Sequence, residues 1–487
     1  YKRQTVIQIR RQVFTEVARM AYANVKGEQA NHLMRKIPYT IIPGEEGKLR
    51  KDIFLERAIV EERVRLAMGL PTRRMDEHNS VVSGLEDASI ADKYYDPPLV
   101  NVIKFACNRC PEKLVKVSDL CQGCLAHPCM EVCPKKAITW ESGRSTIDQE
   151  KCIKCGRCAT VCPYNAIVKT ERPCAAACGM GAIHSDELGR AEIDYSKCVS
   201  CGQCLVNCPF GAIADKGQIY QLIQGFNRGD RIYALVAPAF INQFPSLAST
   251  GKLKAALKAI GFYDVVEVAI GADLCTVDEA HDFLEEVPEK LDFMATSCCP
   301  AYYRAAQLHI PEIKEYVSST KTPMYYTAEL VKKEHPQSVA VFVGPCFAKR
   351  VEAETDPNVD YVLTFEEMNA IFSGANINVA TAEPAEFTTV SCAQGRGFPL
   401  TGGVAGAVAS LVEGKVDIRP EKIDGLSTEN IKLLKRYATK GCECNMIEVM
   451  SCPGGCIAGP GCIAMPNKAT IQVKNYTAQG EDLKTKA

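Results

Sequence analysis

No stretch of the sequence stays apolar for the roughly eighteen residues that a membrane-spanning helix needs, so no membrane span is expected. An excess of one charge is also absent. The 57 lysines and arginines nearly balance the 58 aspartates and glutamates, and the formal net charge of -1 argues against a broad basic surface for nucleic acid. The seven histidines have no metal-ligand spacing. No secretory leader is recognisable after Tyr1, and we expect a cytoplasmic protein.

Cysteine, by contrast, is abundant, with 26 among 487 residues. The disulfides of a secreted protein are one explanation. However, the chain is long enough for about two to four domains, and most of its cysteines fall in C-x-x-C clusters that are often followed by proline. This pattern favours metal thiolates in a reducing compartment.

The start and end of the chain differ from its middle. Residues 1–100 hold no cysteine, and apolar residues at helical spacing over 10–25 and 49–69 predict a helical N-terminal region. The polar residues 466–487 predict a C-terminal tail that wraps around the protein or frays.

Two domains are predicted between these ends. Residues 101–216 hold sixteen cysteines and predict an α+β, polyferredoxin-like domain. Over 217–465, apolar runs such as DVVEVAIG and VAVFVG alternate with helical stretches such as KLKAALKAIG. This alternation predicts an α/β domain with mainly parallel strands.

The cysteine-rich domain contains a repeat that ends in C-x-x-x-C-x-x-x-A-I. Two of its four copies have the full bacterial ferredoxin spacing, in which three close cysteines hold one 4Fe–4S cubane and a fourth, before proline, ligates its partner. A third copy has a longer gap. The fourth lacks its own C-x-x-C, which Cys107 and Cys110 would complete.

Sixteen cysteines therefore predict four accessory 4Fe–4S clusters, and the domain resembles the four-cluster electron-transfer subunits of molybdenum oxidoreductases. The predicted ligand sets are Cys121, Cys124, Cys129 with Cys162; Cys152, Cys155, Cys158 with Cys133; Cys198, Cys201, Cys204 with Cys178; and Cys107, Cys110, Cys174 with Cys208. The alternative for the last set is a zinc site in which Cys107 and Cys110 pair with Cys174 and Cys178.

Three later segments carry further cysteines: TSCCPAYYR, GPCFAKRVE and EVMSCPGGCIAGPG. Adjacent cysteines such as Cys298 and Cys299 cannot easily serve one metal site together, so one ligates and the other is a spare thiol. Four ligands from three distant segments would build a buried cubane. The first two segments directly follow apolar strands, where parallel sheets bind their ligands.

These three segments resemble the signatures of the iron-only (FeFe) hydrogenases, over about residues 231–465. The resemblance implies two lobes of mainly parallel sheet with helices around a buried H-cluster. This cofactor is a 4Fe–4S cubane bridged to a two-iron subsite with CO, CN and dithiolate ligands. The implied cubane ligands are Cys299, Cys346, Cys452 and Cys456, with Cys456 as the bridge. Around the subsite, the resemblance implies Lys349 as a donor to a cyanide ligand, Pro238 as a backbone contact and Met450 as a packing group.

The resemblance also implies a proton relay through Cys298, Glu279, Asp282 and Ser318. Asp282 stands where many relatives carry glutamate, so a water is expected to fill the gap. Without the motif, Glu279 and Asp282 would be read as a solvated helix face.

Some positions depart from the family pattern. Tyr302 replaces a common tryptophan, Gly344 a methionine, and Ala405-Gly406 a methionine–glutamate pair, which resembles the subgroup called group B. Five cysteines match no ligand position and are expected to be mostly small buried apolar groups: Cys275, Cys392, Cys442, Cys444 and Cys462. Cys442-Glu443-Cys444 is a weak indication of redox sensitivity.

The predicted activity is the reversible reduction of protons to H2, with electrons exchanged with a ferredoxin-like carrier and the cofactor installed by maturation proteins. No nucleic acid or membrane partner is expected. The alternatives are a non-catalytic iron–sulfur assembly protein, like the eukaryotic hydrogenase-like proteins, and an H2 sensor. Retention of Cys298, Lys349 and Glu279 favours the enzyme.

Overall fold

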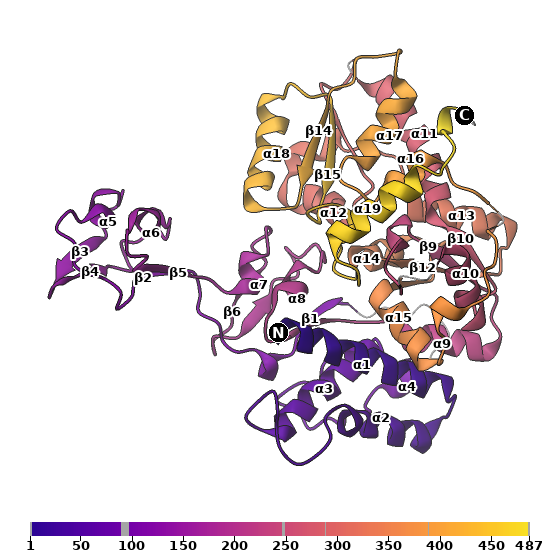
Figure 1. Cartoon of the computed structure of the whole chain (residues 1–487), viewed down its shortest axis with the longest axis horizontal. Coiled ribbons are helices and arrows are strands. Elements are labelled where there is room, and N and C mark those ends of the chain that lie inside the picture. The colour runs from indigo at the N-terminus through magenta and orange to yellow at the C-terminus, as the bar shows by residue number, and fades with distance from the viewer. Residues whose placement is uncertain (1, 89–96, 246–248, 288, 388, 486–487) are drawn as a thin grey trace.

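The structure is a computed structural model that describes residues 2–88, 97–245, 249–287, 289–387 and 389–485. Figure 1 shows a large α/β body, a bundle of N-terminal helices beneath it, and a cysteine-rich arm that projects to one side. Within the described residues, no helix combines the length and the apolar character that a membrane span needs.

The N-terminal region is helical, as predicted. Its helices are α1 (Lys2–Tyr22), α2 (Gly27–Ile41), α3 (Ile53–Ala67) and α4 (Leu85–Ala88). Helix α1 buries an apolar face against α9 (Ile219–Arg228) and α15 (Phe365–Gly374). At Gly374, an added Cβ would lie only 2.8 Å from the Cβ of Ala18, so glycine permits this close approach of α1 and α15.

The cysteine-rich domain consists of short antiparallel strand pairs and single-turn helices. The strand pairs are β1 (Val100–Val102) with β8 (Ile213–Asp215), β2 (Leu114–Val117) with β5 (Ile167–Thr170), β3 (Ile138–Glu141) with β4 (Arg144–Ile147), and β6 (Ile183–Ser185) with β7 (Ala191–Ile193). The helices are α5 (Pro128–Glu131), α6 (Arg157–Val161), α7 (Pro173–Ala176), α8 (Gln203–Asn207) and the 3-10 turn η1 (Lys104–Ala106). The part from β2 to β5 forms the projecting arm, whereas α7 and α8 lie against the body (Figure 1).

The α/β body contains, within the described residues, two sheets whose strand pairs are all parallel. The first sheet has the order β10-β9-β12-β13, with β9 (Ile232–Val236), β10 (Asp264–Glu267), β12 (Val339–Gly344) and β13 (Tyr361–Thr364). The second has the order β11-β15-β14, with β11 (Met294–Ala295), β14 (Pro420–Asp424) and β15 (Met446–Met450). The predicted fold class, an α/β domain of mainly parallel sheet with a ferredoxin-like domain and N-terminal helices, is confirmed.

Helices cover both sheets. They are α10 (Thr250–Ala259), α11 (Val268–Glu286), α12 (Pro300–His309), α13 (Pro323–Glu334), α14 (Ala348–Thr355), α16 (Ala393–Gly397), α17 (Gly403–Val412), α18 (Thr428–Lys440) and α19 (Pro466–Thr477), with 3-10 turns η2 (Pro238–Phe240), η3 (Pro311–Tyr316), η4 (Val379–Thr381), η5 (Cys456–Ala458) and η6 (Leu483–Thr485).

One local expectation was wrong. The run DVVEVAIG was expected to be one strand, but its second half, from Val268, begins α11. A short apolar run that is buried on several sides fits a strand and a helix equally well.

The C-terminal tail was expected to wrap around the protein or to fray. Within its described residues, α19 packs against the body and buries Ala469 and Val473 in the main core.

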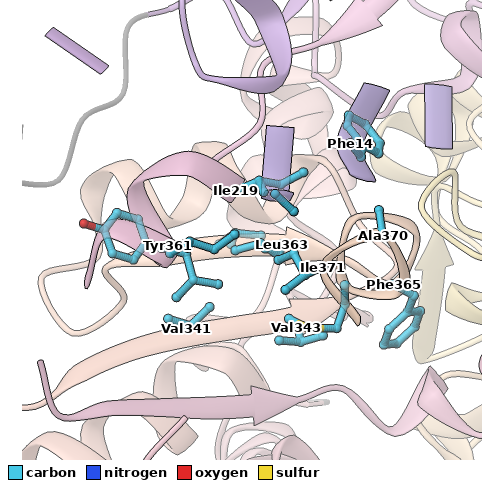
Figure 2. Packing of buried hydrophobic residues seen from close by; sticks show 14 of the residues in the cluster. Phe14, Ile219, Val341, Val343, Tyr361, Leu363, Phe365, Ala370 and Ile371 are labelled. Carbon is cyan, nitrogen blue, oxygen red and sulfur yellow. The ribbon is translucent and has the colours of Figure 1, made fainter. Parts of the chain in front are cut away.

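The main core joins the first sheet to the N-terminal helices. Figure 2 shows Val341 and Leu363 of neighbouring strands packed below Ile219 of α9 and near Phe14 of α1. Phe365 and the rest of α15 close this cluster from the side. The helices of residues 2–88 therefore share a core with the body rather than forming a separate unit.

A buried arginine connects three regions of the chain. The Arg350 guanidinium of α14 donates hydrogen bonds to the carboxylates of Asp215 of β8, at 2.6 Å, and Glu367 of α15. It also donates to the carbonyl oxygen of Val362, at 3.1 Å. On the same side of α15, Arg10 of α1 pairs with Glu366. Because these side chains are almost fully buried, each charge depends on its partners.

We therefore expect Arg350→Met to lower the free energy of unfolding by about 3–5 kcal/mol, because it leaves Asp215 and Glu367 buried without their counter-charge. Arg228→Met, which removes a partly exposed pair with Asp230, should change it by only about 0–1 kcal/mol. Denaturant unfolding of the anaerobically prepared full chain measures both. Equal shifts for the two variants would contradict this account of the junction.

Candidate functional site

Four cysteines from three segments line one cavity. Cys299 caps the N-terminus of α12 after β11, Cys346 follows β12, Cys452 follows β15, and Cys456 opens η5. The carboxyl ends of strands from both sheets therefore deliver these sulfurs to one place, as the sequence predicts for parallel sheets.

The chemistry of this cavity suits a metal–sulfur cluster. Burial raises the pKa of Cys346 to about 11, and the neighbouring Cys299 adds to the effect. Burial also raises the pKa values of Cys452 and Cys456, again with contributions from the neighbouring thiols. Thiolates packed together in this way need positive charge between them, which bound iron supplies. The four residues therefore fit a cubane.

The other predicted cofactor contacts lie around the same cavity. Pro238, Met450, Lys349 and the spare thiol Cys298 all line it. The Lys349 ammonium is 2.7 Å from Glu352. Burial acts to lower the pKa of Lys349, but Glu352 outweighs burial and the pKa is raised, so the side chain stays charged beside the cavity.

Cys298 has a neighbour that was not predicted. Burial raises the pKa of its thiol, and the largest contribution from another side chain comes from Cys275 of α11. Cys275 is fully buried, and the apolar cluster to which it belongs packs against Cys298. The sequence could not identify this contact, because Cys275 belongs to no motif and α11 meets the Cys298 loop only through the tertiary fold.

The predicted proton-relay residues come together, and the hydroxyl groups of Ser319 and Thr320 lie among them. Glu279 is fully buried, and among the described residues neither of its carboxylate oxygens has a hydrogen-bond partner. The Ser318 and Thr320 hydroxyls lie close enough to act on its pKa but do not complete a hydrogen bond. Asp282 accepts hydrogen bonds from Thr320 Oγ1 at 2.8 Å and Ser319 Oγ at 3.2 Å.

Thr320, which the sequence argument did not name, therefore stands between the two carboxyl groups. The Ser318 hydroxyl accepts a hydrogen bond from the backbone N–H of Thr320, at 3.1 Å. The Asp282 side chain is one methylene shorter than a glutamate, and its carboxylate reaches Thr320 and the exposed Ser319. The segment SSTKT offered three hydroxyls in a row, and only the fold selects among them.

Two accessory ligand sets line cavities of their own. Cys107, Cys110, Cys174 and Cys208 line one, and Cys178, Cys198, Cys201 and Cys204 line another. Both groupings are those that the nested pairing predicts. Because Cys174 and Cys178 line different cavities, the zinc alternative that needs both in one site is not supported. Within the described residues, no three or more His, Cys, Asp or Glu side chains converge to hold a single metal ion.

The other two predicted sets lie in the projecting arm. Cys129, Cys158, Cys133, Cys152 and Cys162 pack into one small cluster there. A hydrogen bond found in all four copies explains the repeat in the sequence. The last cysteine of each copy accepts a hydrogen bond from the backbone N–H of the alanine four residues later, at 3.3–3.4 Å, for Cys133, Cys162, Cys178 and Cys208. Such N–H···S bonds stabilise cluster thiolates.

One accessory site adjoins the large cavity. Cys201 lines both cavities, and the Gln203 side chain of α8 donates to Cys452 Sγ at 3.8 Å. Between them, Gly202 has a φ of +77° and packs against Phe347 and Pro460, where a Cβ would collide. Glycine is therefore required for the cysteine loop to approach the α/β body so closely.

The positions that depart from the family pattern do not line the cavity. Gly344 is not among the described residues around it, and an added Cβ would lie 2.3 Å from the ring of Phe342. Phe342 itself lines the cavity. Gly406 is exposed, with nothing near an added Cβ, and Ala405 is buried in a separate apolar cluster. Gly344 therefore lies behind Phe342 and Ala237, which line the cavity, whereas Gly406 lies at the surface.

Comparison with known proteins shows which family the α/β body is similar to. Residues 230–460 match the family described as "Iron only hydrogenase large subunit, C-terminal domain", and residues 145–168 and 190–213 match 4Fe-4S binding domains. The two 4Fe-4S matches therefore precede a hydrogenase-like segment in the chain.

Among curated proteins, the chain is 27% identical over 377 residues to the NADP-reducing hydrogenase subunit HndD of Solidesulfovibrio fructosivorans, covering 64% of this chain and 63% of that one. It is 27% identical over 387 residues to iron hydrogenase 1 of Clostridium pasteurianum, covering 67% of each. It is also 26% identical over 262 residues to a probable cytosolic Fe-S cluster assembly factor of Nematostella vectensis, covering 42% of this chain and 59% of that one. The chain spans less than two thirds of the first and third relatives.

A solved variant of the FeFe-hydrogenase HydA1 from Chlamydomonas reinhardtii is also similar, with 21% sequence identity and a TM-score of 0.42. The match covers 53% of this chain and 85% of that chain.

The buried Glu279 predicts a pH-dependent stability. Burial raises its pKa to about 8, and the charge of Asp282 adds to the effect. In an unfolded chain a glutamate titrates near about 4.3, so the folded protein holds this proton more tightly. Stability therefore falls as pH rises between these values, by up to ~1.4 kcal/mol per pH unit, and levels off above the folded pKa.

Glutamine cannot ionise, so we expect the unfolding free energy of Glu279→Gln to exceed that of the wild type by a margin that grows from about pH 5 to about pH 8. Denaturant titrations across this range measure the margin, and no bound cofactor is required. Glu285→Gln, at an exposed position of the same helix, should show no such growth. A margin that stays constant with pH would mean that Glu279 ionises normally.

Proposed function

We propose that this protein is an iron–iron hydrogenase that catalyses the reversible reduction of protons to H2. The observation that best supports this function is the single cavity lined by four ligand cysteines together with Cys298 and Lys349. Cys299, Cys346 and Cys452 would hold a cubane, and Cys456 would bridge it to a two-iron subsite. When bound, this H-cluster supplies the redox chemistry at its metals.

The protein's own side chains would hold the subsite and exclude water. The Lys349 ammonium, kept charged by Glu352, would donate to an anionic cyanide ligand. Pro238 and Met450 would pack against the subsite, and the lining around them is largely apolar: Val268, Ala272, Phe342, Phe398 and Val404. Such a lining lowers the local dielectric and strengthens the few polar contacts.

Proton transfer would run from the surface to Cys298. Asp282 accepts hydrogen bonds from the exposed Ser319 and from Thr320. The Thr320 hydroxyl in turn lies close to the Glu279 carboxyl group. The raised pKa of Glu279, about 8, places this carboxyl near neutral pH, where it can both accept and release a proton. Cys298 would carry the proton between Glu279 and the cofactor.

Electron transfer would run through the ferredoxin-like domain. The arm formed by β2 to β5 places two of the ligand sets farthest from the body, where a ferredoxin-like carrier could dock (Figure 1). The remaining sets lie along α7 and α8, and Cys201 and Gln203 reach the large cavity. We propose four accessory 4Fe–4S clusters along this route, and assign the chain to subgroup B on the departures at Tyr302, Gly344 and Gly406.

We expect Cys298→Ala to lower H2 production by about 10²–10⁴-fold, because a positioned acid–base group contributes that much. Iron content and the infrared bands of metal-bound CO and cyanide should stay as in the wild type after anaerobic maturation. Cys298→Asp should recover part of the activity, since a carboxyl also carries protons.

Cys392→Ala, at a buried cysteine away from the cavity, is the matched control and should remain active. Near-normal activity of Cys298→Ala would show that protons enter by another route. Absence of CO and cyanide bands in matured wild-type protein would instead reject the hydrogenase assignment.

For the clusters, we expect protein reconstituted without maturation to contain about twenty iron atoms per chain, from five cubanes. Cys110→Ser should lose one cluster and fall to about sixteen. Metal analysis, with Cys392→Ser as the control, checks both values. A wild-type value of about sixteen, or stoichiometric zinc, would show that Cys107 and Cys110 do not hold a 4Fe–4S cluster.

A further inference from the structure

Two cysteines outside every ligand set face each other at the start of β15. Cys442 and Cys444 lie in the turn between α18 and β15, and their sulfur atoms are 2.8 Å apart. The Cys442 thiol is also 3.0 Å from the carbonyl oxygen of Cys444. Neither residue is among those that line the large cavity in the described structure.

The backbone on both sides holds this pair in place. Before it, the N–H of Gly441 donates to the Tyr437 carbonyl at 2.9 Å, which ends α18. After it, Asn445 is fixed by three hydrogen bonds to the segment that precedes β14. Its backbone N–H donates to the Arg419 carbonyl at 3.1 Å, its side chain donates to the Asp417 carbonyl at 2.7 Å, and its side-chain oxygen accepts from the Arg419 N–H at 2.6 Å. The two thiols are therefore held together by the fold.

Their surroundings give the two sulfurs different roles. Both side chains are half-buried, so a reagent can reach them. Burial raises the pKa of Cys444 to about 12, and its bond to Cys442 adds to the effect, as does the charge of Glu421. The Cys444 thiol donates its proton to the Cys442 sulfur. The Cys442 thiol in turn donates to the Cys444 carbonyl oxygen. Because its pKa is raised, the Cys444 thiol is a poor first nucleophile, which leaves the first attack to Cys442.

We propose that Cys442 and Cys444 form a reversible dithiol–disulfide couple that exchanges with a disulfide-bearing partner. The Cys442 thiolate attacks one sulfur of the partner's disulfide, forms a mixed disulfide and releases the first partner thiol. Cys444 then loses its proton, attacks the Cys442 sulfur and releases the second partner thiol. The two electrons of the cysteines end on the partner, which leaves as a dithiol, and the two cysteine protons balance its two new thiols.

This site has a direct connection to the large cavity. β15 runs from Met446 to Met450 as the central strand of its sheet, and Met450 lines the cavity at the other end. The disulfide would therefore form just before one end of β15, and the other end of this strand places Met450 beside the cavity. The couple itself does not depend on the proposed hydrogenase activity.

The test uses the full chain with its clusters bound, equilibrated anaerobically in glutathione buffers of increasing disulfide content. Free thiols are then alkylated, and the protein is denatured and cleaved after glutamate. Cleavage after Glu443 places Cys442 in the peptide 430–443 and Cys444 in the peptide 444–448. We expect these peptides to stay joined after oxidising buffers and to separate, both alkylated, after reducing ones.

Single variants test the order of the two steps. Cys444→Ser should accumulate glutathione on Cys442, because the second attack is lost, whereas Cys442→Ser should leave Cys444 largely unmodified. Cys392→Ser, the buried control, should behave as the wild type. Visible absorbance recorded in parallel reports whether the clusters stay bound.

Separate, alkylated peptides at every buffer ratio would overturn the proposal. So would a disulfide that joins either cysteine to a ligand cysteine rather than to its neighbour. Equal glutathione adducts in the two single variants would overturn the assignment of Cys442 as the attacking thiol. None of these results depends on H2 production, so they leave the proposed function to its own test.

Discussion

The burial of four cysteine sulfurs in one cavity is the constraint on which the rest of the structure depends. The thiols of Cys346 and Cys456 are covered by protein, and their pKa values are raised by burial and by neighbouring thiols such as Cys299. They can be ionised together only around positive charge. Two parallel sheets must therefore present the carboxyl ends of their strands to a common point, and the helices that follow these strands close the space around it.

Burial of charge also explains how the regions of the chain hold together. The cysteine-rich domain has little apolar core of its own, because its strands are short and its interior is filled by cysteines. Its last strand is instead fixed to the body through Asp215 and Arg350, and α1 is fixed to the same face of α15 through Arg10. These contacts hold Gln203 and Cys201 beside the large cavity, so the electron transfer that we propose over this junction would depend on a buried ion-pair network.

The carboxyl group that we propose for proton transfer is controlled by burial rather than by ion pairs. Glu279 has no hydrogen-bond partner among the described residues, and burial rather than a neighbouring cation sets its protonation. Such a group is costly for stability and useful for proton transfer, because its pKa moves towards neutral pH. Thr320 and Asp282 then connect it to the surface through short polar side chains.

The sequence by itself determined what is local. The spacing of cysteines predicted the accessory ligand sets, and the alternation of apolar runs predicted parallel α/β layers, because both depend on neighbouring residues. Only the tertiary structure decided which distant groups meet. It separated Cys174 from Cys178, brought Cys275 beside Cys298, placed Thr320 between Glu279 and Asp282, and set Gly344 against the ring of Phe342. The direction of a side chain depends on the packing of elements far apart in the chain, which a local pattern does not encode.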